Sequence, residues 1–341
     1  MTTRLPFARW ALLALVGLLP TMLVPAAAGA ASDPTAELRV LTPDRVLDPG
    51  THYVLGPQKV KTDPKADCNF GGTGGTGAVF DFPKPTGLSL LAAGADARGS
   101  LRPLSVSDEF GFGLAVCAIG GVDDRPGTFW YFKRNHKELT VGADQERIKR
   151  GDEFLVYLAP DTFPEPNVKE LELIAPARAQ TGSQFEVRVV EHGCVTDQNT
   201  FETTCGSAPA AGVTITGAPG GATTDASGKA KVRAAKSGKL KLGATRAPDI
   251  AAKTLQVCVA EELDACPAKH GRRIFGNAGA NKIKGTAGAD EIRGGAGRDR
   301  IDLRKGGPDK VDCGPGRDTV LVKRKDRDDK IARNCERVRR R

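Results

Sequence analysis

The chain has 341 residues, of which 40% are hydrophobic and 27% are charged, and its net charge is +9. That hydrophobic content is enough to bury cores, and the length predicts two or three domains. The charge alone would suit a nucleic-acid partner, but Phe275 is the only aromatic residue after Phe201. Base stacking on single strands needs aromatic side chains, so we expect no nucleic-acid partner.

Residues 1–30 are predicted to be a signal peptide. Arg4 and Arg9 make a positively charged start, residues 10–24 are nearly all apolar, and residues 28–30 are small enough for cleavage. An uncleaved membrane anchor is the alternative, but Pro20 and Pro25 interrupt the apolar stretch. We expect a secreted or extracellular protein with no stable membrane span after cleavage, and association with the cell wall is a further expectation.

The eight cysteines agree with export, because an even count in a secreted chain indicates disulfides. Zinc is the alternative, but the chain has no CxxC motif and its four histidines are scattered. Eight cysteines allow about 105 pairings, so the sequence proves none of them. Local pairing keeps each bridge within one domain and predicts Cys68–Cys117, Cys194–Cys205, Cys258–Cys266 and Cys313–Cys335.

Residues 37–160 form the first predicted domain. Alternating or β-prone runs predict strands over 37–41, 78–82, 128–132 and 153–157, with a turn at Asn135 and His136. Thr86 is expected to cap a short helix. The glycine-rich run 71–77 lacks the Gly-Lys-Ser/Thr ending of a phosphate loop and leads into a strand, so we interpret it as a loop.

Over roughly 85–160 this order of elements, with Trp130, Tyr131 and Asn135 on and after the aromatic strand, resembles the transcobalamin-like β-grasp family catalogued as DUF4430. In cobalamin carriers such a domain closes over the corrinoid together with a large helical barrel. Nothing in this chain corresponds to that barrel, so the resemblance gives little support for a cobalamin site. Neighbours on a strand face opposite sides, and we expect at least one of Trp130 and Tyr131 to pack in the core.

Residues 161–167 are rich in proline and predict a linker, and residues 168–266 are predicted to be all β. The turn over 224–230 followed by a strand and Ser237-Gly238 is similar to bacterial immunoglobulin-like domains. Cys194–Cys205 is expected to close a long inserted loop, and Cys258–Cys266 to hold the exit from the last strand. An acidic cluster at 261–264 is interpreted as a solvated loop in preference to a metal site.

Residues 272–341 contain a repeat of about nine residues. Its apolar positions are Ile283, Ile292, Ile301, Val311 and Val320, and the positions two residues earlier are Asn281, Asp290, Asp299, Asp309 and Asp318. Glycine-rich turns precede them, and the run 294–301 is the clearest example. The pattern resembles the haemolysin-type (RTX) calcium repeat, which builds a parallel β-roll.

The resemblance implies that two repeats make one coil and that Ca²⁺ is the bound ion. Asp299 should then face Asp318, and Asp290 should face Asp309, so the predicted metal ligands are Asp290, Asp299, Asp309 and Asp318. Glycine exposes backbone carbonyls, and aspartate supplies the charged oxygens that a hard cation needs. Nearby lysines and arginines oppose the ion, so we expect an affinity no tighter than about 10⁻⁴ to 10⁻³ M. The alternative is a metal-free coil that Cys313–Cys335 closes with a capping unit.

The C-terminal region is also basic, with 22 Lys and Arg against 11 Asp and Glu in residues 268–341. For an exported protein, an anionic cell-envelope polymer or polysaccharide fits this charge, and a solvated surface is the alternative. The sequence does not indicate an oligomeric state.

No catalytic motif is present, so we predict no enzyme, no catalytic residues and a mainly β, multidomain fold of β-grasp, immunoglobulin-like and β-roll parts. The predicted function is a secreted or cell-surface binding or structural protein with a calcium-stabilised C-terminal module. The alternative is a secreted hydrolase anchored by that module, with a site around His136, Asp108 and Glu109.

Overall fold

The computed structural model describes residues 31–69, 74–124, 127–161, 168–197, 199–200 and 202–341. By its contacts, the chain from Ser32 to Arg341 forms one compact unit. The predicted signal peptide, most of the predicted linker and part of the glycine-rich run 71–77 lie outside the described residues. As predicted, the unit is mainly β and contains several sheets. No helix among the described residues is long and apolar enough to cross a membrane.

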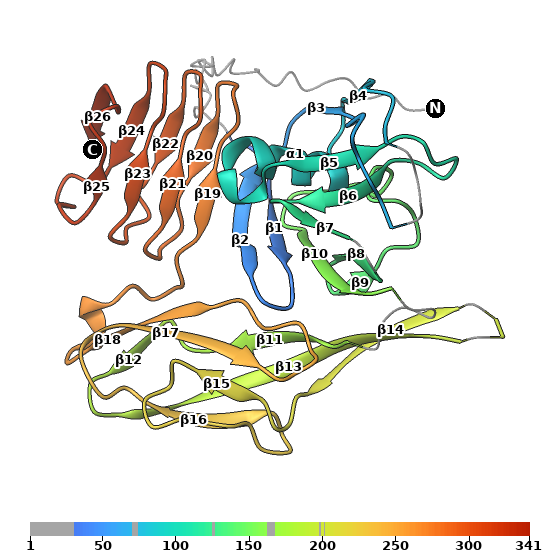
Figure 1. The fold of residues 1–341 in the computed structure, drawn as a ribbon. Helices are drawn as coiled ribbons and strands as arrows, with labels where there is room; N and C mark the ends of the chain where they lie inside the picture. The colour runs from blue at the N-terminus through green and yellow to red at the C-terminus, as the bar shows by residue number, and fades with distance from the viewer. Residues whose placement is uncertain (1–30, 70–73, 125–126, 162–167, 198, 201) are drawn as a thin grey trace, which may run out of the picture. The chain divides into compact units, whose positions relative to one another are not determined.

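The first region is a mixed sheet with one helix, α1, on a face (Figure 1). The strands of its sheet lie in the order β2-β1-β10-β8-β9, and the central pair β1 and β10 is parallel. The bounds are β1(Thr35–Leu41), β2(Val46–Val54), α1(Gly87–Ala97), β8(Thr128–Arg134), β9(Lys137–Glu138) and β10(Glu153–Pro160). Smaller strands are β3(Gln58–Lys61), β4(Val79–Phe82), β5(Leu104–Ser107), β6(Ala115–Ile119) and β7(Val122–Asp123). The predicted strands of this region are therefore all present.

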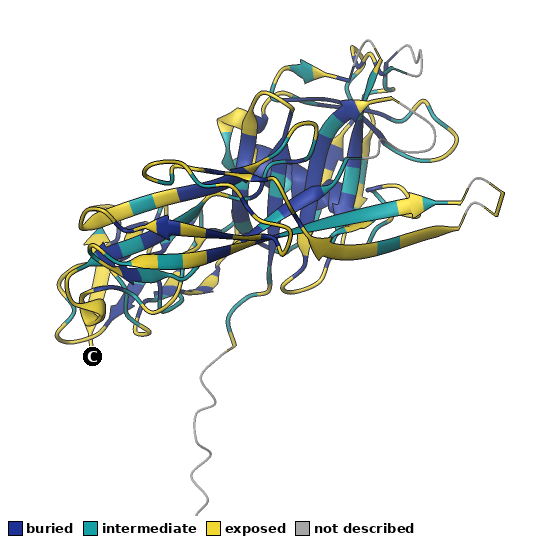
Figure 2. Cartoon of the chain, turned by 90° about the horizontal axis from the view of Figure 1, so that it is seen from below, coloured by how far each residue is buried: buried dark blue, intermediate teal, exposed yellow. Residues whose placement is uncertain are grey.

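Thr86 begins the helix, as predicted. Its hydroxyl accepts a hydrogen bond from the Ser89 N–H at 3.2 Å, and the Ser89 hydroxyl accepts one from the Thr86 N–H at 2.7 Å. This reciprocal pair satisfies two donors that a helix start leaves open. The helix then buries Leu88, Leu90 and Leu91 against the sheet, and Figure 2 shows it in dark blue.

The aromatic strand β8 contributes to two cores. Trp130 is fully buried in the core beneath the helix, whereas Tyr131 belongs to a cluster on the opposite side of the sheet with Tyr157 and Ile250. Successive side chains of a strand face opposite sides, which explains the division. Both residues pack in cores, which confirms the expected role of at least one of them.

The second region consists of two four-stranded sheets around one core. One sheet has the order β11-β13-β14 with β16 also on β13, and the other has the order β12-β18-β17-β15. The bounds are β11(Glu170–Ile174), β12(Arg178–Gln180), β13(Gln184–Thr196), β14(Thr203–Pro209), β15(Thr214–Thr216), β16(Lys229–Arg233), β17(Gly238–Thr245) and β18(Leu255–Ala260). The arrangement agrees with the all-β prediction for residues 168–266.

All four predicted disulfides are present. The setting of one differs from the prediction: Cys194 and Cys205 are directly paired residues of β13 and β14, not the ends of a loop. Seven residue pairs, from Val190↔Pro209 to Thr196↔Thr203, extend these strands as an exposed ribbon, largely yellow and teal in Figure 2. Neither face of this ribbon is buried, so its sequence has no alternation of apolar and polar residues that would predict paired strands.

The third region is the predicted coil, in which each strand pairs in parallel with the strand two repeats later. The strands are β19(Arg273–Phe275), β20(Lys282–Lys284), β21(Glu291–Arg293), β22(Arg300–Asp302), β23(Lys310–Asp312), β24(Thr319–Val322), β25(Lys330–Ile331) and β26(Arg337–Arg340). They form two stacks, β19-β21-β23-β25 and β20-β22-β24-β26, coloured orange to red in Figure 1. The predicted apolar positions are all buried along the axis.

Within the predicted region 272–341, the coil has strands at both ends beyond the five predicted apolar positions. Strand β19 precedes the first predicted unit and pairs in parallel with β2, so one nine-stranded sheet runs from the coil into the first region. At the other end, β25 and β26 continue the two stacks beyond Cys313. Cys335 lies between β25 and β26, so the disulfide Cys313–Cys335 does not replace these strands; its role as a cap stays a prediction.

Candidate metal centre in the C-terminal coil

The turns of the coil place the carboxylates in two columns. We define the first column as Asn281, Asp299, Asp318 and Glu336, and the second column as Asp290, Asp309 and Asp329. Each member lies directly before a strand of the coil, on the same side as the other members of its column. Because adjacent parallel strands keep their register, the columns are set by the pairings Ile283↔Ile301↔Val320 and Ile292↔Val311↔Ile331.

A ladder of hydrogen bonds joins the members of each column. In the first column, the backbone N–H groups of Asn281 and Asp299 donate to Oδ1 of Asp299 and Asp318, both at 2.8 Å, and Asp318 N–H donates to Glu336 Oε2 at 2.8 Å. In the second column, Asp290 N–H donates to Oδ1 of Asp309 at 2.9 Å, and Asp309 N–H donates to Oδ1 of Asp329 at 3.1 Å. The ladder brings Asp299 next to Asp318 and Asp290 next to Asp309, the pairs expected from the repeat.

The ladder uses only one oxygen of each carboxylate. Within the part of the chain that the structure describes, Oδ2 of Asp299, Asp309, Asp318 and Asp329 is buried and has no hydrogen-bond partner. Buried polar atoms are nearly always paired, and an unpaired carboxylate oxygen is especially costly. Four such atoms in two columns fit a cation that takes oxygen ligands.

Burial changes the charge state of these groups. Desolvation raises the pKa of Asp309 to about 8, and the charges of Asp290, Asp329 and Asp326 add to the rise. Desolvation also raises the pKa of Asp299 to about 6, with a further contribution from Asp318. A bound divalent ion would reverse this balance, because it stabilises the ionised form of each carboxylate.

Glycine leaves the space beside these oxygens. A Cβ atom added at Gly294 would lie 2.5 Å from Oδ2 of Asp299 and 2.3 Å from the carbonyl oxygen of Cys313. Gly297 has a φ of +115°, a conformation that L side chains rarely adopt. The turn therefore brings a carboxylate oxygen and a carbonyl oxygen to one small space that no side chain fills. The donor set of the columns fits Ca²⁺.

The first member of each column, Asn281 or Asp290, differs from the later members, because nearby protein groups hydrogen-bond to its side chain. Asp290 accepts hydrogen bonds from Arg272 N–H at 2.8 Å, from Thr286 N–H at 2.5 Å and from the Thr286 hydroxyl at 2.8 Å. Asn281 exchanges hydrogen bonds with Asn277, at 2.8 Å to its Oδ1 and 2.9 Å from its Nδ2. Of the four predicted ligands, Asp299, Asp309 and Asp318 have an unpartnered oxygen, whereas Asp290 does not.

The prediction from sequence missed Asp329 and Glu336. They lie 20 residues after Asp309 and 18 after Asp318, and no glycine-rich turn precedes either of them. One signal could have found them: Ile331 and Val338 follow two residues later, as the apolar residues follow the other members. The spacing of ten residues between Ile301 and Val311, one longer than the other spacings, does not shift the strand register, because Val311 stays paired with Ile292.

The residues suggested for a hydrolytic site are held by different partners. Asp108 accepts hydrogen bonds from Thr76, at 2.7 Å from its N–H and 2.5 Å from its hydroxyl. His136 instead lies 3.1 Å from Glu170 and stacks on His192. The contacts of Asp108 and His136 therefore do not bring these two residues together.

Of the comparisons with known proteins, one family model matches part of the coil. Residues 275–307 match the family model of the RTX calcium-binding nonapeptide repeat, in four copies, and repeats of this family bind Ca²⁺. A search of curated proteins finds no match to the chain. A solved structure from Ruminococcus gnavus ATCC 29149, provisionally described as a metal binding protein, is 17% identical over 38% of this chain and 100% of its own, with a TM-score of 0.22. A TM-score that low establishes no shared fold.

The match confirms the RTX resemblance of the C-terminal region. The resemblances of residues 85–160 to the transcobalamin-like family and of residues 168–266 to immunoglobulin-like domains are not confirmed by these comparisons, and they stay predictions.

Proposed function

We propose that this chain is an exported, cell-surface binding or structural protein whose C-terminal coil is completed by Ca²⁺ outside the cell. The observation that carries the proposal is the set of buried oxygens on Asp299, Asp309, Asp318 and Asp329 that have no hydrogen-bond partner among the described residues. The four disulfides support an extracellular setting.

Two ions are the simplest assignment. Asp299 and Asp318 would hold one in the first column, together with carbonyl oxygens of the turn at Gly294. Asp309 and Asp329 would hold another in the second column. Each ion supplies positive charge where two carboxylates are stacked, which stabilises the folded coil without any chemical step.

Calcium binding would also make the stability of the coil differ between the inside and the outside of the cell. The ion is scarce inside cells and abundant outside, and a ligand that binds only the folded state stabilises that state. Before export the buried carboxylates would oppose each other, and after export the ion would neutralise them. The coil would therefore reach full stability only where the protein works.

The exposed face of the coil suggests a partner. The strand register aligns Lys282, Arg300 and Arg337 in one row, with Thr319 between the last two. Neighbouring strands lie about 4.8 Å apart, so the row presents closely spaced positive charges on an exposed face. A linear anionic polymer of the cell envelope matches such a row.

Calorimetric titration of Ca²⁺ into the full chain tests the proposal. The unaltered chain should bind Ca²⁺ in the range of about 10⁻⁴ to 10⁻³ M and gain thermal stability. Asp299→Asn combined with Asp318→Asn should remove the binding heat of the first column and part of that gain. The matched control is Asp302→Asn, which alters a carboxylate paired at the surface with Arg304.

An unaltered chain that shows no binding heat and the same unfolding temperature in calcium and in chelator would overturn the calcium part. The binding or structural role would be overturned by turnover of polysaccharides or peptides by the full chain.

A further inference from the structure

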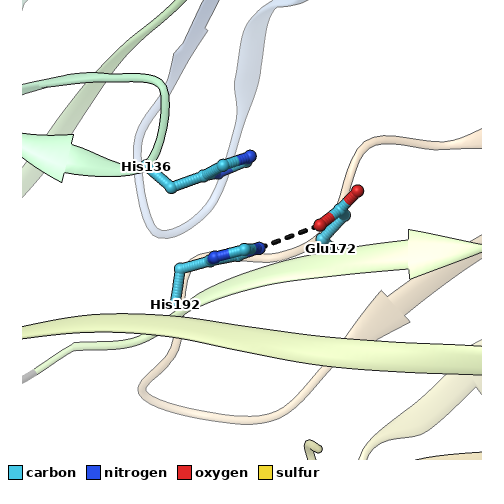
Figure 3. A group of neighbouring side chains, drawn as sticks. All are labelled: His136, Glu172 and His192. Atoms are coloured by element: carbon cyan, nitrogen blue, oxygen red, sulfur yellow. Dashed lines mark hydrogen bonds and ion pairs between the residues drawn. The ribbon is translucent and has the colours of Figure 1, made fainter. Parts of the chain in front are cut away.

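A second group of metal-ligating side chains lies away from the coil. It consists of His136, at the tip of the β8–β9 hairpin, and of Glu172 and His192 on the neighbouring strands β11 and β13 (Figure 3). One ligand atom from each of the three residues lies within 4.8 Å of the others. All three side chains are partly exposed, so an ion could reach them from solvent.

Strand pairing places two of the ligands. Glu170 is paired with His192 across β11 and β13, and Glu172 lies on the same face as Glu170 because strand side chains alternate. Nε2 of His192 lies 2.9 Å from Oε2 of Glu172. Ligand atoms around a tetrahedral ion at the usual zinc distances lie about 3.3 Å apart, so this pair is already close to the required spacing.

The backbone conformation of the hairpin turn positions the third ligand, His136. Asn135 and His136 have φ angles of 51° and 66°, the pair of left-handed conformations that a two-residue hairpin turn requires. This turn lays the His136 ring on that of His192, with 3.9 Å between ring centroids and 8° between planes. The unusual backbone thus directs an imidazole toward the other two side chains.

One carboxylate, that of Glu170, lies beside a nitrogen of His136, where a metal-bound histidine commonly has an outer contact. Nδ1 of His136 lies 3.1 Å from Oε1 of Glu170, although this contact does not meet hydrogen-bond geometry. Glu170 is 5% exposed, and its other oxygen, Oε2, is buried without a partner within the described part of the chain. A carboxylate behind an imidazole nitrogen commonly orients a histidine for a metal on its other nitrogen.

We infer that His136, His192 and Glu172 form a site for a divalent transition-metal ion of the zinc class. Two imidazoles and one carboxylate suit such an ion, whereas Ca²⁺ prefers oxygen ligands alone. Parallel rings cannot both direct a ring nitrogen at one ion, so binding requires His136 to tilt out of its stack. The site would join the β8–β9 hairpin to strands β11 and β13, and a solvent molecule would complete the coordination.

Zinc titration of the full chain in saturating Ca²⁺ tests the inference, because the calcium keeps the coil columns occupied. One Zn²⁺ should bind per chain. His136→Asn, which tolerates the left-handed backbone, and His192→Gln should each weaken binding by at least about 100-fold, the upper end of the loss caused by outer-shell changes. His52→Gln is the matched control, because His52 pairs with Glu37 and is not one of the three ligands.

Cobalt gives a second readout that does not depend on stability. Co²⁺ bound by two imidazoles and a carboxylate in a tetrahedral site should give visible absorption bands that Zn²⁺ abolishes and that either histidine variant lacks. Weak zinc binding that His136→Asn and His192→Gln leave unchanged would overturn the inference. The three residues would then be ion-paired groups that hold the hairpin against β11 and β13.

Discussion

The backbone N–H of Asp299 donates a hydrogen bond of 2.8 Å to the side chain of Asp318, a residue one full coil later in the chain. This contact fixes one oxygen of Asp318, and the other is buried with no partner in the described part of the chain. Repetition of the same contact along both columns makes the coil depend on the charge state of its carboxylates. The coil should therefore respond to calcium, to pH and to changes in the residues that surround its oxygens.

Asp309→Asn should change stability in opposite directions with and without calcium. In chelator at pH 7 the variant should be more stable by about 1–3 kcal/mol, because Asp309 must take up a proton or bury its charge on folding. An amide does neither, and its oxygen can still accept the Asp290 hydrogen bond. In saturating calcium it should be less stable than the unaltered chain, because a ligand of the second column is lost. Urea unfolding in chelator and in calcium measures the two changes in stability. A substitution that changes stability equally under both conditions would contradict the prediction.

The stability of the metal-free coil should fall as pH rises. The pKa of Asp309 is raised to about 8 and that of Asp299 to about 6, both by desolvation. In the unfolded chain these groups titrate near pH 3.9, so between about pH 4 and 8 the folded state holds protons that the unfolded state has released. The stabilising contribution is therefore complete below about pH 4 and is lost as pH rises through 6 and 8. Urea unfolding in chelator across this pH range measures the loss.

Calcium binding should accordingly release protons at pH 7, mainly from Asp309. Binding heats measured in two buffers with different ionisation enthalpies would show this release. Equal heats in the two buffers would show instead that both carboxylates are already ionised before calcium binds.

Gly294→Ala should weaken calcium binding in the first column. The added Cβ would lie 2.5 Å from Oδ2 of Asp299 and 2.3 Å from the Cys313 carbonyl oxygen, so it would crowd two oxygens that are proposed to bind the ion. We expect at least a tenfold loss in affinity, equal to about 1.4 kcal/mol. Gly99→Ala is the control, because a Cβ there has no neighbour within 4 Å; a similar loss from both variants would contradict the prediction.

Removal of the basic row should weaken binding to a polyanion. Retention of the full chain on immobilised poly(glycerol phosphate) should fall when Lys282, Arg300 and Arg337 are all changed to Gln, and it should fall with added salt. Changing Lys229, Lys231 and Lys241 of the second region to Gln removes the same charge from exposed positions on its two sheets. Equal effects of the two triple variants would show that net charge, not the row, determines retention.

Local patterns in the sequence predicted much of this fold. The β-prone run from Phe154 to Tyr157, the cap at Thr86 and the recurring Ile and Val of the coil are each decided by residues close together in the chain. The four disulfides also agree with the economy of local pairing. Where both faces of a strand are exposed, as around Cys194 and Cys205, the pattern carries no burial signal, and a paired ribbon cannot be distinguished from a loop.

The amino-acid sequence by itself determined the coil: its period places one apolar side chain on the axis and one oxygen ligand in the turn of each repeat, and this rule needs no distant partner. Only the tertiary structure decided which of these ligands still have an oxygen available for a cation. Thr286 satisfies Asp290, Asp329 joins Asp309 despite irregular spacing, β19 continues the sheet of β2, and His136 meets His192 from 56 residues away. These relationships arise from packing between segments that the chain brings together only on folding, and no local periodicity encodes them.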